Sequence, residues 1–103
     1  MQNQRILLYE LNEVPKKLID LYVKIKPKSS FAKILKKGIV LNTKSNDDGE
    51  LHPWSTWPTV HRGVTNKLHN IRYINQDLSI ANKYKPIWEI LIEKKIDIGI
   101  FGS

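Results

Sequence analysis

Three short apolar runs constrain the fold of this 103-residue chain more than any other feature. They cover residues 6–9, 39–43 and 96–101, and the first of them shows no polar alternation. Such a run is expected of a strand that is buried on both faces of a parallel sheet. Segments of helical periodicity lie between the runs, so the sequence predicts strands that alternate with helices.

The first two predicted helices follow the first run. Apolar residues recur at helical spacing from Val14 to Ile25, where Pro27 would stop the helix. A second, shorter helix should begin after Ser29 or Ser30, which can cap it, and Gly38 suits a left-handed position at its end. These two helices would connect the first predicted strand to the second.

Two prolines mark the starts of the remaining predicted helices. Pro58 and Pro86 each suit a first helical position, where the missing N–H is no loss. The polar residues 45–50 read as a loop, and residues 69–83 also read as a loop with an extended piece at 71–74. The resulting order of elements predicts an α/β fold, with helices packed on a largely parallel sheet in αβα layers. At this length we expect a single domain over residues 1–103.

Composition narrows the class of protein. With 17 Lys+Arg against 10 Asp+Glu, the net charge of +7 favours anionic partners, although a plain solvated surface explains the same lysines. The absence of cysteine excludes disulfides and thiolate metal sites. We find neither a signal peptide nor an apolar stretch of 18 residues, so we expect a cytoplasmic chain without a membrane partner.

The stretch from His52 to Gly63 is the strongest candidate for chemistry. If a helix begins at Pro58, Thr56 lies at its positive end, where an anion or a developing alkoxide is stabilised. A capping role for Thr56 is the simpler alternative. His61 and His69 lie eight residues apart, which fits no standard metal spacing.

Acidic residues follow the first predicted strand at the sheet edge where open α/β folds bind ligands. Glu10, Asn12 and Glu13 supply oxygen atoms that a divalent cation could use. The same residues are also suitable for the start of a helix, where a cap and carboxylates are favourable. Both interpretations remain open on the residues alone.

The order of these motifs resembles the N-terminal part of the alkaline phosphatase superfamily, and most closely its type I phosphodiesterase and nucleotide pyrophosphatase branch. Residues 6–10 match the first strand with its metal-binding acid, and residues 34–40 match a passage from helix to strand. Thr56-Trp57-Pro58-Thr59 matches the Thr-Phe-Pro-Asn nucleophile motif, and residues 69–71 resemble a His-Gly-Ile turn. The resemblance covers nearly the whole chain.

The resemblance implies a metal-dependent phosphoester hydrolase acting on a small-molecule phosphoester. Thr56 would be the nucleophile, and two divalent cations, zinc, would be held in part by Glu10 and Thr56. Substrate would be contacted by Thr59, His61 and Arg62. Glu10 stands where the branch has Asp, and Thr59 stands where it has Asn.

The family supplies further Asp and His ligands far downstream of the nucleophile. We therefore expect this chain to be an N-terminal fragment, a single partial domain with an incomplete metal site and no turnover alone. The alternative is a small basic, non-catalytic α/β module that binds an anionic partner such as nucleic acid. The sequence does not indicate the oligomeric state.

Overall fold

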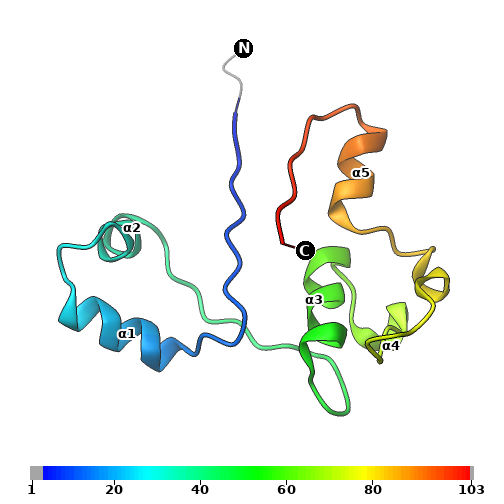
Figure 1. Ribbon diagram of the computed structural model, residues 1–103, viewed down its shortest axis with the longest axis horizontal. Coiled ribbons are helices and arrows are strands. Elements are labelled where there is room, and N and C mark those ends of the chain that lie inside the picture. Colours follow the sequence, from blue (N-terminus) through cyan, green and yellow to red (C-terminus); the bar gives the residue numbers. More distant parts are fainter. Residues whose placement is uncertain (1–3, 103) are drawn as a thin grey trace. The chain divides into compact units, whose positions relative to one another are not determined.

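The computed structural model describes residues 4–102, and the regular structure within this range is helical (Figure 1). The elements are α1 (Lys16–Ile25), α2 (Ser30–Lys37), α3 (Pro53–Arg62), α4 (Asn66–His69), the 3-10 helix η1 (Leu78–Ala81) and α5 (Ile87–Glu93). None of residues 4–102 lies in a strand. The predicted α/β fold with a largely parallel sheet is therefore wrong for this structure.

The three apolar runs that were predicted as strands lie outside regular secondary structure and are largely exposed. The exposed fraction is 93% at Ile6, 89% at Ile39 and 102% at Phe101. A strand becomes part of a sheet only when a neighbour takes up its backbone N–H and C=O groups. Apolar composition indicates that a segment can be buried, but it does not supply the neighbouring strand.

The chain divides into two compact units, Met1–Asn42 and Thr43–Ser103. The first unit contains α1 and α2, both of which the apolar spacing predicted correctly. Tyr22 and Phe31 meet edge to face, with ring centroids 6.2 Å apart, and so join the two helices.

Helix α2 is capped where the sequence predicted. The Ser29 hydroxyl accepts a hydrogen bond from the Ala32 amide at 3.1 Å, which satisfies one of the amides at the start of the helix. Gly38 ends the helix, but its φ of −88° and ψ of −177° are extended rather than left-handed. The predicted end of α2 is confirmed, and the predicted conformation of Gly38 is wrong.

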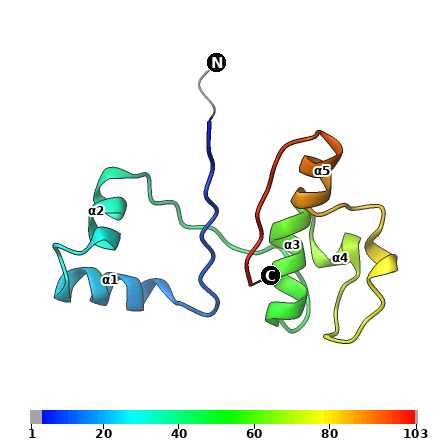
Figure 2. The ribbon, with the colours of Figure 1, turned by 45° about the horizontal axis from the view of Figure 1, so that its top comes forward.

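The second unit contains α3, α4, η1 and α5, and in it α3 contacts α4 (Figures 1 and 2). Helix α3 begins at Pro53, five residues earlier than predicted, and Pro58 lies inside it. It ends at Gly63, whose φ of 66° is the left-handed conformation that glycine adopts without strain. Helix α5 follows Pro86, as predicted.

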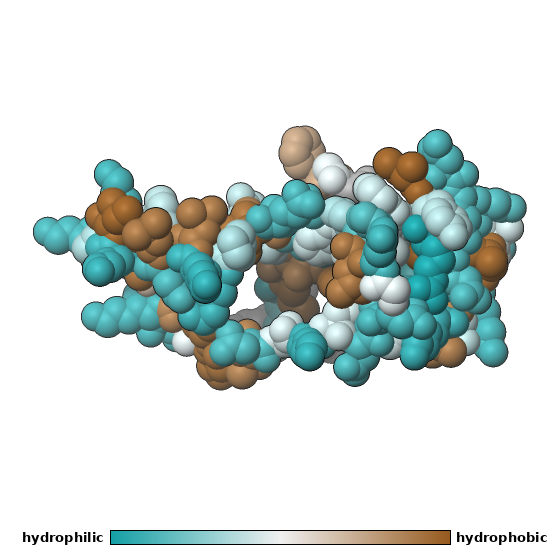
Figure 3. Space-filling model, turned by 90° about the horizontal axis from the view of Figure 1, so that it is seen from below, coloured by the Kyte–Doolittle hydropathy of each residue, from teal (hydrophilic) through white to brown (hydrophobic). Residues whose placement is uncertain are grey.

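The apolar core is small in the part of the chain that the structure describes. Ala32, Ile71 and Ala81 are its buried hydrophobic residues, and Ser55, Asn66 and His69 are buried polar residues. Many large apolar side chains are exposed, and Figure 3 shows them in brown among hydrophilic side chains in teal. Within residues 4–102, no helix has the length and apolar character needed to cross a membrane.

Candidate functional site

Thr56, the predicted nucleophile, lies in the first turn of α3 rather than ahead of the helix. The amides of Ser55 and Thr56 both donate to the His52 carbonyl oxygen at 2.9 Å, so neither amide is available to an anion at this helix end. The Thr56 hydroxyl also donates to the His52 carbonyl oxygen, at 3.1 Å. The prediction that Thr56 precedes a helix starting at Pro58 is therefore wrong, because Pro53 takes the first helical position.

The predicted metal ligands Glu10 and Thr56 belong to different units of the chain. Their convergence on one cation, and the role of Thr56 as a nucleophile, therefore stay predictions. Within residues 4–102, no three His, Cys, Asp or Glu side chains come together to hold a metal ion. The described part of the chain therefore holds no metal-binding group of its own, which corrects the zinc-binding assignment for these residues, and divalent cations bound with further ligands downstream stay a prediction.

Thr59, which was predicted to contact substrate, lies inside a network of polar side chains. Its hydroxyl donates to Asp47 Oδ2 at 2.7 Å and lies 2.9 Å from His69 Nε2. The Ser55 carbonyl oxygen lies at 3.3 Å and competes weakly for the same hydroxyl proton. The shorter bond to a charged carboxylate is the stronger of the two.

Asn66 attaches the loop before α3 to the start of α4. Its backbone amide donates to Asp47 Oδ1 at 2.7 Å, and its side chain exchanges two hydrogen bonds with the backbone of Asp48, at 2.9 and 3.1 Å. Asn66 is fully buried, so these bonds replace the water that its amide would otherwise bind. We call the four residues Asp47, Thr59, Asn66 and His69 the polar latch.

His69 takes part in the polar latch as a neutral ring. Its Nδ1 accepts a hydrogen bond from the Ile71 amide at 2.9 Å, so in the neutral ring the proton is on Nε2 and points to the Thr59 hydroxyl. The ring is fully buried. Burial lowers the pKa of His69 below 6.5, and the charges of Arg62 and Arg72 act in the same direction, whereas Asp47 opposes them.

Arg72 and Lys67 form ion pairs with Asp48 in the loop before α3. Arg72 Nη1 donates to Asp48 Oδ1 at 2.7 Å, and Lys67 Nζ lies 3.7 Å from Asp48 Oδ2. The Arg72 side chain lowers the pKa of the Asp48 carboxyl group. The Trp54 indole N–H donates to the Arg72 carbonyl oxygen at 3.1 Å, which connects α3 to the same segment.

The other predicted substrate contacts, Arg62 and His61, are engaged within the second unit. Arg62 Nη1 donates to the carbonyl oxygens of Ala81, at 3.3 Å, and Tyr84. The His61 ring lies between two tryptophans, parallel to Trp57 at 5.7 Å and edge-on to Trp88 at 5.0 Å. The Arg62 hydrogen bonds and the contact of His61 with Trp88 attach α3 to the chain that follows it, whereas the contact with Trp57 lies within α3. The substrate-binding roles of both residues stay predictions.

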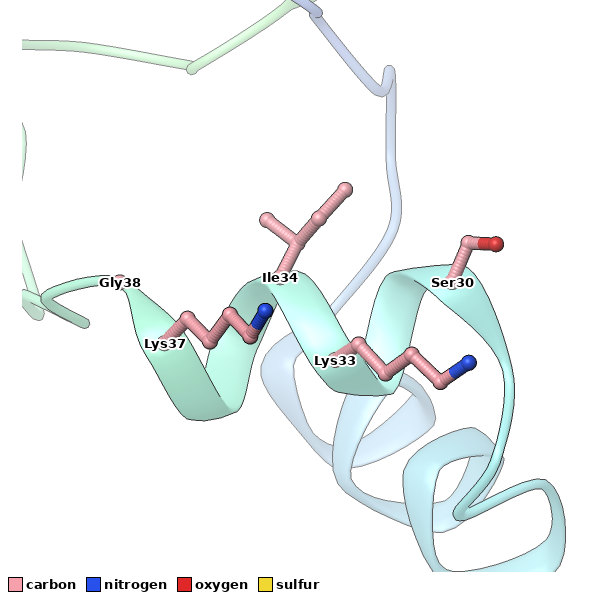
Figure 4. A pocket seen from close by; sticks show the side chains of 5 residues that line it. All are labelled: Ser30, Lys33, Ile34, Lys37 and Gly38. Carbon is pink, nitrogen blue, oxygen red and sulfur yellow. The ribbon is translucent and has the colours of Figure 1, made fainter.

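Two of the three lysines on α2 line a shallow surface depression. This open depression is lined by Ser30, Lys33, Ile34, Lys37 and Gly38, and Figure 4 shows the two lysine side chains leaving the helix on the same side. The depression is formed by one short helix and its cap, so it does not enclose a ligand. Binding of an anionic partner stays a prediction.

Sequence reasoning missed the polar latch. Asp47 and Asn66 lie in polar stretches without periodicity. His69 was considered only for its spacing from His61 and for its resemblance to a His-Gly-Ile turn. The available signal was the concentration of hydrogen-bonding side chains on both sides of α3. No family model, no curated protein and no solved structure matches this chain.

Proposed function

We propose that this chain is the N-terminal part of a phosphoester hydrolase in which Thr56 is the nucleophile. The Thr-Trp-Pro-Thr motif at residues 56–59 and the order of the surrounding motifs suggest this function. The structure contributes one observation, which concerns the three hydroxyl groups of α3: Ser55, Thr56 and Thr59.

Of these three hydroxyl groups, that of Thr56 has the surroundings best suited to attack. Ser55 is only 2% exposed, and Thr59 is engaged by the polar latch. Thr56 is partly exposed, and its 3.1 Å bond to the His52 carbonyl oxygen is a neutral one that a substrate oxygen can replace. This difference in burial and bonding supports the assignment of the nucleophile to Thr56.

The proposed reaction has two steps. In the first step, Thr56 Oγ1 forms a bond to phosphorus while the bond between phosphorus and the ester oxygen breaks. The proton lost by the Thr56 hydroxyl is taken up by the departing alcohol. Water then cleaves the phosphothreonine and restores the hydroxyl group. The divalent cations that the resemblance implies stay a prediction, and we assign no step to them.

The test uses the protein expressed from its complete reading frame. Hydrolysis of p-nitrophenyl phosphate and bis(p-nitrophenyl) phosphate is measured, and acid-quenched protein is examined by mass spectrometry for phosphate on Thr56. Thr56→Ala should lower kcat by a factor of about 10³ or more, since a missing nucleophile removes the covalent route. Thr65→Ala is the matched control, because the Thr65 side chain makes no capping hydrogen bond at α4.

Two results would count against the proposal. One is that neither ester is hydrolysed, and the other is that Thr56→Ala has unchanged activity. Binding of a labelled 20-nucleotide single strand that weakens steeply with salt, and that is insensitive to Thr56→Ala, would favour the anion-binding alternative.

A further inference from the structure

The polar latch spans the segment that carries Thr56. The bond from Thr59 to Asp47 joins residues twelve positions apart, and Thr56 lies between them. Asp47 belongs to the loop before α3, and Thr59 lies one turn after Thr56. This hydrogen bond therefore fixes the loop before α3 relative to the middle of the helix.

The backbone of α3 needs such support at this turn. Pro58 has no N–H, so it cannot donate to the Trp54 carbonyl oxygen as another residue at this position would. The helix therefore lacks one of its own hydrogen bonds immediately after Thr56. Contacts from outside α3 then have a larger share in fixing the Thr56 turn.

The outside contacts come from α4 and its start. The Asn66 amide holds the second oxygen of Asp47 at 2.7 Å, and His69 Nε2 lies 2.9 Å from the Thr59 hydroxyl. Asn66 and His69 are both fully buried, so water does not compete for these bonds. The carboxylate of Asp47 is therefore held from α3 and from α4 together.

We propose that Asp47, Thr59 and His69 are positioning residues for the Thr56 hydroxyl. This inference rests on the proposed function of Thr56. It assigns Thr59 to the support of the nucleophile turn rather than to contact with the substrate. Removing the Thr59 hydroxyl should loosen that turn while leaving α5 unchanged.

Amide hydrogen exchange of the chain tests the positioning role without any activity assay. In Thr59→Val, which keeps the shape and removes the hydroxyl, exchange at residues 54–57 should rise about tenfold or more. Thr59→Ser keeps the hydroxyl and should restore slow exchange. Unchanged exchange at residues 54–57 in Thr59→Val would overturn the inference, and so would an equal rise in α5 that Thr59→Ser does not correct.

Kinetics of the protein from the complete reading frame give the second measurement. Thr59→Val should lower kcat and the rate of phosphothreonine formation, with KM unchanged, and Thr59→Ser should recover both rates. A rise in KM with kcat unchanged would show substrate contact and overturn the positioning role. Full activity in Thr56→Ala would instead overturn the proposed function itself, which keeps the two failures distinguishable.

Discussion

Acidification is expected to destabilise the second unit through His69. This ring is fully buried and neutral, and its Nδ1 accepts the Ile71 amide proton at 2.9 Å. A second proton on the ring would be bound at Nδ1, where its N–H would point at the N–H of Ile71 and the hydrogen bond between them would be lost. The charge would be buried and would stand near Arg62 and Arg72, while the nearby Asp47 acts in the opposite direction; burial is the largest effect, and the pKa of His69 is lowered.

The direction of the effect follows from the two pKa values. In the unfolded chain the pKa of His69 has its usual value of 6.5, and in the folded chain it is lower. Below pH 6.5 the unfolded state therefore binds more protons, and the free energy of unfolding decreases. One proton corresponds to a loss of about 1.4 kcal/mol per pH unit until the folded pKa is reached, and stability is fully present above pH 6.5.

Denaturant unfolding between pH 5 and pH 8 measures this loss. All three tryptophans, Trp54, Trp57 and Trp88, belong to the second unit, so their fluorescence reports its unfolding. His69→Gln should remove the decrease between pH 6.5 and the folded pKa, at the cost of a lower stability at pH 8. His52→Gln is the control, because His52 is a partly exposed residue beside the exposed Glu50.

Two outcomes would refute the reasoning about His69. One is a free energy of unfolding that stays constant between pH 5 and pH 8 in the unmodified chain. The other is an NMR titration in which the His69 ring protonates at or above pH 6.5.

Two further substitutions test local features of the fold. Asn66→Ala leaves the Asp48 amide without its side-chain partner, while the Asp48 carbonyl oxygen keeps the bond from Arg72 Nη1 at 3.2 Å. The substitution should therefore lower the free energy of unfolding of the second unit by about 1–3 kcal/mol, and an unchanged free energy in denaturant unfolding would contradict this. Ser29→Ala removes the cap of α2 and should lower the local free energy of opening of that helix, measured by amide exchange, by about 1 kcal/mol. Ser30→Ala, inside the helix, should lower it less. Equal effects of these two serine substitutions would contradict the capping role.

Features that depend on nearby residues were predictable from the sequence. The spacing of apolar residues located α1 and α2, Ser29 and Gly38 marked the two ends of α2, and Pro86 marked the start of α5. A helix bonds residues four positions apart, so its position is recorded locally. Pro58 misled the prediction because Pro53, five residues earlier, is equally suited to a first helical position.

The runs at residues 6–9, 39–43 and 96–101 show the limit of local patterns. Their apolar composition is compatible with buried strands, yet among residues 4–102 none is paired in a sheet. Pairing depends on a second segment distant in sequence, and no local pattern specifies that segment.

The sequence by itself therefore determined α1, α2 with its Ser29 cap, the start of α5 and the candidate nucleophile motif. Only the tertiary structure decided the polar latch, because its bonds join residues ten or more positions apart, such as Asp47 with Thr59 and Thr59 with His69. It also decided which hydroxyl of α3 is buried, which is engaged and which is partly exposed. Burial and hydrogen bonding at these positions depend on how α3 meets α4 and the loop before it, and neither is recorded in any short stretch of sequence.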